Sequence, residues 1–239
     1  MPNSYADLVK KLKKAGSKER AKVSARFFKT GKGQYGQGDI FLGIGVPEQR
    51  KIAREFKYLP AADIKKLLKS KVHEHRFVAL EILVIRYEKG NEKEKKEIVA
   101  FYLKNIDGVN NWDLVDTSAP YILGHYLLGK NKKVLYDFAK SKSIWRKRVA
   151  IISTQYFIRQ NHFEDTLKIA KLLLQDKHDL IHKAVGWMLR EVGNKSLQTE
   201  LEFLDKHYTI MPRTMLRYAI EKFPKEKRKQ YLKKKYENS

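Results

Sequence analysis

The sequence contains no cysteine in its 239 residues and no apolar run approaching 18 residues. Without cysteine the protein forms no disulfide, thiolate nucleophile, iron–sulfur cluster or cysteine-type zinc site. Without a long apolar run it has no transmembrane helix, and no signal-peptide core is recognisable. These absences predict a soluble intracellular protein, cytoplasmic in location and nucleoid-associated if the source is bacterial.

Acidic residues are few beside basic ones, with 27 Asp and Glu against 51 Lys and Arg. The net charge of +24 creates self-repulsion in a compact state, and a large polyanionic partner would relieve it. Nucleic acid is the first choice for that partner. An anionic membrane surface is the second choice, weakened by the lack of an apolar span. The length allows one large domain or two small ones, and we expect a single domain over residues 1–239.

Alternating strands joined by Asn-Gly or Asp-Gly turns are also absent, whereas helical periodicity runs through most of the chain. Phe77, Leu80, Val84 and Tyr87, for example, follow the spacing of one helix face. Helix-capping residues punctuate the pattern; they include Ser17, Asn91, Ser143 and Asn161 at expected starts and Gly193 at an expected end. The sequence therefore predicts an all-α protein.

The helices repeat. A basic residue preceding an apolar stretch recurs at Arg76, Arg148, Lys183 and Arg217, with separations of 72, 35 and 34 residues. Trp112 lies at the midpoint of the longest interval. A period near 35 is typical of stacked helix pairs, because a lone pair cannot bury its apolar face. We expect a HEAT-like solenoid whose concave basic face carries these positions, although solvated helix faces are the simpler interpretation of such charges.

Two segments depart from the helical pattern. A Gly-rich stretch, 30–39, happens to contain G-x-G-x-x-G, but it follows a helical segment and lacks the strand that a dinucleotide site requires. A flexible loop is the favoured interpretation, and a loop whose backbone approaches phosphate is the minority one. The basic tail, 225–239, is expected to be a terminal helix or a frayed end that adds phosphate affinity or solubility.

Most catalytic patterns find no support. His73, His75 and His162 form no metal-binding motif and have no carboxylate at useful helical spacing, so neither a metal nor another cofactor is expected. Ser118 and Ser153 lack the context of a serine nucleophile.

Asp116 is the exception. It lies four residues after Trp112, so both side chains project from one helix face. Asp113, by contrast, is expected to complement the helix dipole. A carboxylate in a groove that binds phosphate needs a positive group in the ligand to compensate it. Trp112 and Trp187 are either core residues, the commoner role of tryptophan, or a recognition platform beside this acid.

These residues resemble a known family, the AlkD-type DNA alkylation repair glycosylases built from HEAT-like repeats. The resemblance covers nearly the whole chain. Its segments are Arg26–Gly31, Phe41–Ile44 with Pro47, Trp112–Asp116, Ile144–Trp145 with Arg148, and Lys183–Trp187 with Leu189–Glu191. The sequence departs from the family pattern at two positions. It has Gly45 where the family pattern has an amide side chain, and Phe27 where the family pattern has a tyrosine.

The resemblance implies a monomeric enzyme that excises N3- and N7-alkylated purines, such as 7-methylguanine and 3-methyladenine, from duplex DNA without base flipping. It implies that Asp116 is the catalytic acid, that Trp112 and Trp187 pack against the deoxyribose, and that Arg148 holds a backbone phosphate. Further DNA-binding residues are expected at Lys183, Arg190, Arg217 and Phe27.

Other functions stay open at this point. A non-catalytic repeat protein that binds damaged, bent or branched DNA is the main alternative, followed by a solenoid that binds RNA or protein. A lysine-dependent strand-cleaving lyase is a further alternative, which the resemblance disfavours.

Overall fold

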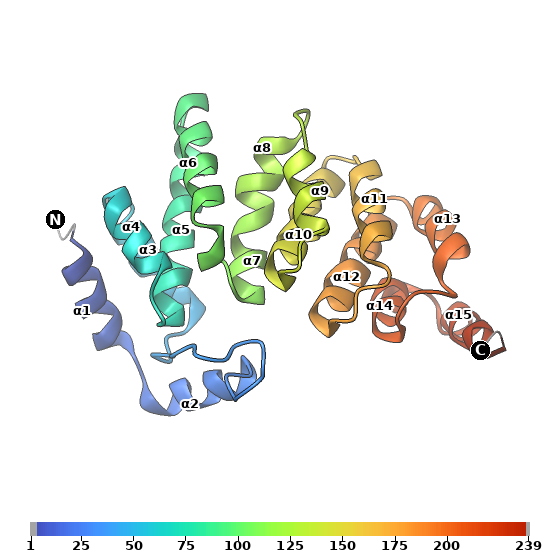
Figure 1. Cartoon of the computed structure of the whole chain (residues 1–239), viewed down its shortest axis with the longest axis horizontal. Coiled ribbons are helices and arrows are strands. Elements are labelled where there is room, and N and C mark those ends of the chain that lie inside the picture. Colours follow the sequence, from blue (N-terminus) through green and yellow to red (C-terminus); the bar gives the residue numbers. More distant parts are fainter. Residues whose placement is uncertain (1–3, 238–239) are drawn as a thin grey trace. The chain divides into compact units, whose positions relative to one another are not determined.

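The computed structural model describes residues 4–237 and is helical, as Figure 1 shows. An isolated parallel β-bridge joins Ile40 to Val72 within this helical framework. The all-α prediction is therefore confirmed. Across residues 4–237, none of the helices has the length and apolar character needed to cross a membrane.

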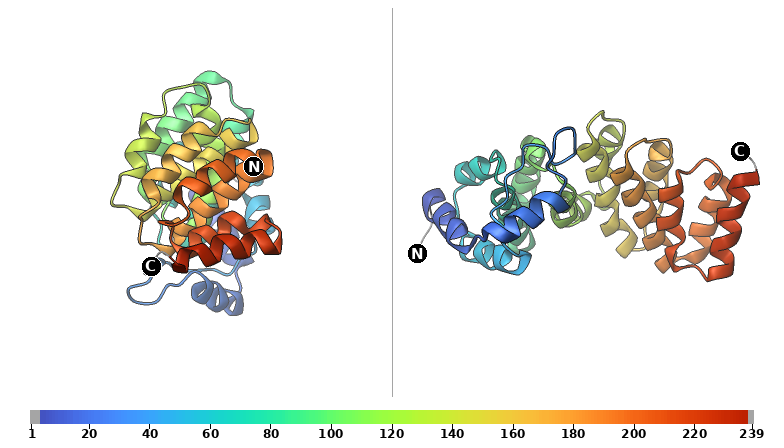
Figure 2. Two further views of the ribbon diagram at one scale, coloured as in Figure 1. Left: turned by 90° about the vertical axis from the view of Figure 1, so that its right-hand side faces the viewer. Right: turned by 90° about the horizontal axis from the view of Figure 1, so that it is seen from below.

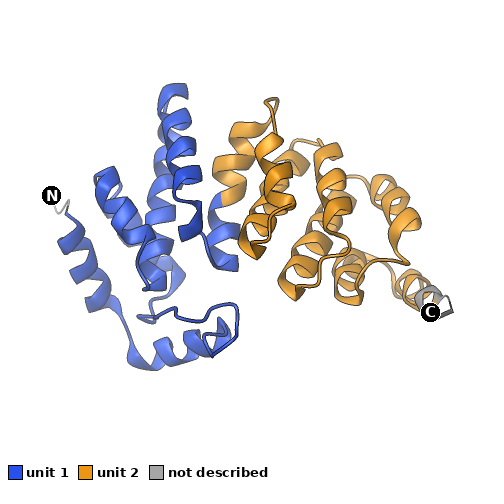
Figure 3. Ribbon diagram, in the orientation of Figure 1, with its two compact units in different colours: residues 1–118 blue, residues 119–239 orange. Residues whose placement is uncertain are grey.

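The chain divides into two compact units, residues 1–118 and 119–239, coloured separately in Figure 3. Each unit is described by itself below. The expectation that residues 1–239 form one domain stays a prediction.

Unit 1 is built around α5, a buried helix against which the neighbouring helices pack. Helices α3 and α4 pack on one side of α5, α6 follows it, and α1 packs on α3 and α4. Leu8 and Leu12 of α1 and Ile64 of α4 are fully buried in this core. The helices of unit 1 are α1 (Tyr5–Ala15), α2 (Lys18–Phe27), α3 (Val46–Glu55), α4 (Ala61–Leu68), α5 (His73–Lys89), α6 (Glu92–Lys104), the 3₁₀ turn η1 (Ile106–Gly108) and α7, which ends at the unit boundary (Trp112–Ala119).

In unit 2 three helices pack in succession, α10 on α12 and α12 on α14. Helices α9, α11 and α13 flank this row, and Figure 2 shows the orange and red helices side by side from two further directions. The elements are the π-helical turn η2 (Pro120–Gly124), α8 (His125–Leu127), α9 (Lys133–Ala139), α10 (Ile144–Arg159), α11 (Glu164–Leu173), α12 (Asp179–Lys195), α13 (Leu197–His207), α14 (Arg213–Ala219), the 3₁₀ turn η3 (Ile220–Lys222) and α15 (Lys225–Glu237).

The α-helical pattern of α7 ends at Pro120 for a chemical reason. Proline has no N–H, so it cannot donate the usual helical hydrogen bond to the carbonyl of Asp116, four residues earlier. The chain continues as the π-helical turn η2 instead. Wider turns of this kind often occur near functional residues.

The predicted helix boundaries are correct in part. Ser17, Asn91 and Ser143 are N-caps whose side chains accept backbone N–H groups. The prediction for Asn161 is wrong, because α11 begins later, at Glu164, and Asn161 adopts positive φ after α10. The prediction for Gly193 is also wrong: it lies inside α12, where the Glu200 carboxylate occupies the space that a Cβ would need. Residues of the tail form helix α15 as far as Glu237, and positions 238–239 lie outside the described residues.

Candidate functional site

Trp112 is the first residue of α7, and its indole belongs to a stack of aromatic rings. The ring of Phe28 lies parallel to Trp112 at a centroid distance of 5.2 Å and an interplanar angle of 14°. Phe41 also stacks on Phe28, at 4.9 Å, and Phe27 meets Trp112 edge-on at 5.9 Å. Such pairs contribute about 0.5–1.5 kcal/mol each beyond the area they bury. We call these four rings the aromatic stack; Phe27 is its open end, with 63% of its surface exposed.

His73 is a buried neighbour of the aromatic stack, in contact with both Phe28 and Phe41. Its ring stacks on Phe41 at 4.6 Å, and only 2% of its surface is exposed. Nε2 lies 2.7 Å from Oδ2 of Asp113, and Nδ1 lies 3.3 Å from Oδ2 of Asp39. Burial alone would lower the pKa of His73, but the hydrogen bonds to Asp113 and Asp39 outweigh it, and the pKa is raised. The two carboxylates therefore favour the protonated, cationic form of the imidazole.

Asp39, at the end of the Gly-rich loop, connects that loop to the start of α7. Its carboxylate accepts hydrogen bonds from Arg76 at 2.7 Å and from Asn111 at 3.2 Å, besides its contact with His73. Burial would raise the pKa of Asp39, yet these partners hold it below its usual value. Asn111 in turn accepts the backbone N–H of Trp112 at 2.8 Å. The loop is thus anchored to the residue that begins α7.

Asp116 lies one turn after Trp112 on α7 and is half-buried. The helix that carries it is fixed on two sides. Thr117 donates to Glu81 of α5 at 2.7 Å, and the hydroxyls of Ser118 and Tyr102 lie 2.9 Å apart in the interior. Together with the contact between His73 and Asp113, these bonds set the rotation of α7 and so the direction in which Trp112 and Asp116 project.

The remaining predicted residues lie in unit 2. Arg148 of α10 is buried, with 5% of its surface exposed, and its guanidinium donates to the carbonyl of Leu180 at 2.8 Å. Lys183 of α12 is half-buried and pairs with Asp179 one turn earlier at 2.7 Å. This pairing lowers the pKa of Asp179 against the opposing effect of burial.

Trp187 lies one turn beyond Lys183 on α12 and is half-buried, so it is not a core residue. Its indole N–H donates to Glu191 at 2.9 Å. Arg190 is half-buried and forms an ion pair with Glu221, and Arg217 of α14 is exposed.

Unit 1 thus carries Trp112 and Asp116 one turn apart on α7, with Phe27 against Trp112. Unit 2 carries the other predicted residues on α10, α12 and α14. The expectation that both groups share one basic surface stays a prediction. One repeat position has a different role from the expected one: Arg76 is 2% exposed and bonds to Asp39 and to the carbonyl of Ser70, so it anchors the loop.

Sequence reasoning missed the polar network beneath the aromatic stack. It assigned Asp113 to the helix dipole, whereas Asp113 pairs with His73. It also looked for partners of His73 only at helical spacing, and the partners come from 34 and 40 residues away. The available signal was Asp113, which directly follows Trp112 in the sequence. Within residues 4–237 no group of His, Asp and Glu side chains is arranged to hold a metal ion.

Comparison with known proteins identifies the family of this chain. A model of DNA alkylation repair enzymes matches residues 8–223, which is most of the chain. The chain belongs to this DNA alkylation repair family. A solved structure described as a predicted DNA alkylation repair enzyme from Enterococcus faecalis is similar in fold, with a TM-score of 0.69 at 17% identity, over 88% of this chain and 97% of that one. No curated protein matches the sequence. Membership in the family implies an enzyme that acts on DNA.

Proposed function

We propose that this protein is a monofunctional DNA glycosylase that hydrolyses the N-glycosidic bond of N3- and N7-alkylated purines in duplex DNA, without flipping the base. The observation that carries the proposal is the half-buried carboxylate of Asp116, one turn from an indole, in a family member with a net charge of +24. In a surface that binds phosphate, an anion at this place weakens binding unless the bound nucleotide becomes positive.

Alkylated purines satisfy that condition. Alkylation at N3 or N7 gives the base a formal positive charge, so it leaves without a general acid. As the glycosidic bond breaks, positive charge moves to the deoxyribose as an oxocarbenium-like ion. The carboxylate of Asp116 stabilises that cation and orients or deprotonates the water that attacks C1′, as carboxylates do in glycosidases.

The size of this effect is sufficient to matter. Opposite charges about 4 Å apart at an effective dielectric near 20 attract by roughly 4 kcal/mol. At about 1.4 kcal/mol per tenfold change, that corresponds to a rate factor on the order of 10³.

The indoles have a related role. We propose that Trp112 and Trp187 pack against the deoxyribose, where their π faces attract the developing cation. The stacking of Trp112 on Phe28 supports this role, because it holds the indole rigid at the start of α7.

DNA affinity comes from basic residues and from Phe27. Arg148 is proposed to hold a backbone phosphate near the lesion, with Lys183, Arg190 and Arg217 as further phosphate contacts. We propose that these residues lie on the concave face of a HEAT-like solenoid and that the protein acts as a cytoplasmic monomer. The recurrence of basic residues at intervals near 35 supports this arrangement.

The test is product analysis on a duplex with a single 7-methylguanine. We expect free 7-methylguanine together with intact strands that contain one abasic site, and we expect Asp116→Asn to release almost none. Direct strand cleavage by the wild-type protein would indicate a lysine-dependent lyase instead. Tight binding to bent or branched DNA with no base release would favour a non-catalytic DNA-binding protein and overturn the proposal.

A further inference from the structure

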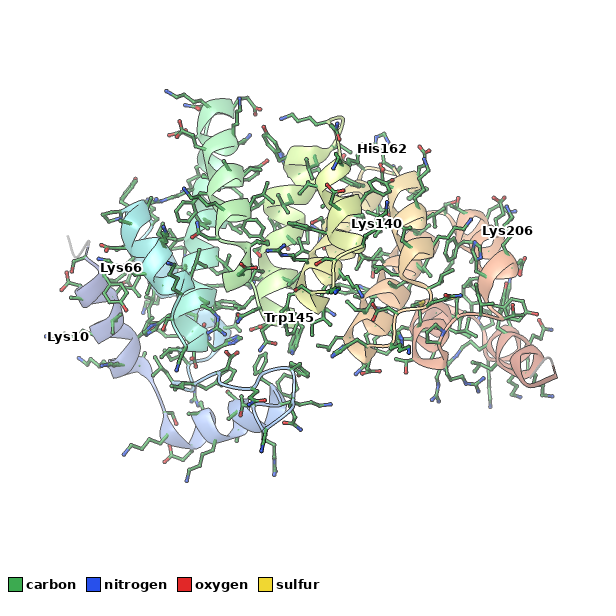
Figure 4. All side chains as sticks on the ribbon, viewed as in Figure 1. Lys10, Lys66, Lys140, Trp145, His162 and Lys206 are labelled. Carbon is green, nitrogen blue, oxygen red and sulfur yellow. The ribbon has the colours of Figure 1, made fainter. Side chains whose placement is uncertain are left out.

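Helix α2 is unusual within unit 1 because none of its ten residues is buried. Figure 1 shows it set apart from α3, α4 and α5, and in Figure 4 several of its side chains project away from the rest of the ribbon. An isolated helix of this length is only marginally stable in water, because packing supplies most helical stability in proteins. Seven of its ten residues are exposed, so those side chains are available to a ligand.

The two ends of α2, in contrast, are held firmly. At its start, the N–H of Ser17 donates to the carbonyl of Leu42 at 2.8 Å. Gly43 lies so close that an added Cβ would stand 2.3 Å from the carbonyl oxygen of Ser17, and its φ of +78° favours glycine. At its end, Phe27 and Phe28 contact Trp112. The helix is thus a fixed bridge that leads to the candidate site.

The bridge is strongly basic. Residues 18–32 contain six cationic side chains and one carboxylate, Glu19, which accepts a hydrogen bond from Ser17 at 2.9 Å. All six cations are exposed, and none forms an ion pair with any residue described between 4 and 237; they are Lys18, Arg20, Lys22, Arg26, Lys29 and Lys32.

The spacing of these cations suits a phosphate backbone. Lys18, Lys22 and Arg26 recur every four residues, so they form one row along α2. At 1.5 Å per residue the row is about 12 Å long. One DNA strand presents a phosphate about every 3.4 Å of helix axis, so the row can face about three or four phosphates.

We propose that residues 18–32, the basic arm, bind the phosphate backbone of duplex DNA beside the nucleotide that contacts Trp112. The position beside a reacting nucleotide rests on the proposed function; the binding of backbone phosphate is tested separately. The charge of the basic arm favours DNA over a second copy of the protein as its ligand. A second copy of the arm would bring a net charge of +5 against +5, and the exposed Phe27 joins the arm to the aromatic stack, so one ligand can contact both.

The experiment measures the salt dependence of binding to an unmodified duplex. Each phosphate contact contributes about 0.9 to the slope of log K against log salt. The variant Lys18→Gln/Lys22→Gln/Arg26→Gln should therefore have a slope shallower by about 2 to 3 than that of the wild-type protein.

The matched control is a triple glutamine variant of exposed lysines on α6, which removes the same charge from the same unit; its residues are Lys93, Lys96 and Lys104. We expect the control to keep the wild-type slope. Equal slopes for the two triple variants would overturn the proposal, and so would a shift in oligomeric state of the arm variant with an unchanged slope.

Folding and catalysis are separated by two further measurements. Circular dichroism reports whether the triple variant folds; if it does not, the single variant Lys22→Gln should still reduce the slope by about 0.9, and an unchanged slope would overturn the proposal. Asp116→Asn should keep the full wild-type slope. If the wild-type protein releases no base but the arm variant still has the shallower slope, only the proposed reaction is contradicted. If the arm variant keeps the wild-type slope, the proposal for the basic arm is contradicted.

Discussion

His73 is expected to be the residue on which the candidate site of unit 1 most depends. The substitution His73→Ala removes a ring that is 2% exposed, together with its contacts at 2.7 Å to Asp113 and at 3.3 Å to Asp39. Asp39 keeps Arg76 and Asn111 as partners. The loss therefore falls mainly on Asp113, at the first turn of α7.

Removing one partner of a buried ion pair costs about 3–5 kcal/mol. The lower end applies here, because the Asp113 side chain is 15% exposed and water screens part of its charge. We expect His73→Ala to lower the free energy of unfolding by about 3 kcal/mol. For a chain of this size that corresponds to a fall in Tm of about 6–12 °C.

The pH dependence has a definite sign. The pKa of His73 is raised in the folded protein above its ordinary value of 6.5, because the hydrogen bonds to Asp113 and Asp39 outweigh burial. Its contribution to stability is therefore complete below pH 6.5 and is lost as the pH rises through the folded-state pKa. The difference between wild type and His73→Ala should shrink over that interval.

Urea unfolding of wild type and variant, repeated from about pH 6 to about pH 10, measures both effects. The control is His162→Ala, which replaces an exposed histidine and should change stability by less than about 0.5 kcal/mol. A difference for His73→Ala below about 1 kcal/mol at the acid end, or one that grows with pH, would refute the reasoning.

Three other substitutions have defined outcomes. Phe27→Ala removes a ring that is 63% exposed but meets Trp112 edge-on, so it should lower Tm by about 1–6 °C and weaken binding to methylated duplex, as a titration would show. Asp39→Asn should release the Gly-rich loop from Arg76 and His73; limited proteolysis should cut the loop faster, and an unchanged cleavage rate would be contrary evidence. Burial raises the pKa of Glu200 to about 8, against the charges of Arg190 and Lys227. The folded protein therefore loses stability as the pH rises from the ordinary glutamate pKa of 4.5 toward that value. Glu200→Gln should be more stable than wild type at the alkaline end in urea unfolding, with no such gain at the acid end.

The helical fold could be predicted from the sequence because apolar spacing and caps act locally. Periodicity correctly predicts that Phe77, Leu80 and Val84 of α5 are buried, but not that burial extends around the whole helix from His73 to Val84. Gly193 shows the limit of local rules, since glycine usually ends a helix but here admits the Glu200 carboxylate from α13.

The candidate site could be predicted only in part. Trp112 and Asp116 share a helix, so their spacing reveals a common face. The anchoring of α7 depends on contacts between residues far apart in the chain, such as Asp39 with Asn111 and His73 with Asp113. No periodicity encodes those contacts. The interpretation of the Gly-rich loop as flexible missed the same anchor, because Asp39 at its end finds its partners only in the fold.

The most direct test of the central claim is the single-turnover rate at which Asp116→Asn releases 7-methylguanine from a methylated duplex, measured beside its affinity for that duplex. The carboxylate argument predicts a rate lower than wild type by a factor on the order of 10³, with DNA affinity equal to or above that of wild type. Release at the wild-type rate would contradict the account, and so would a loss of release that merely follows a loss of DNA binding.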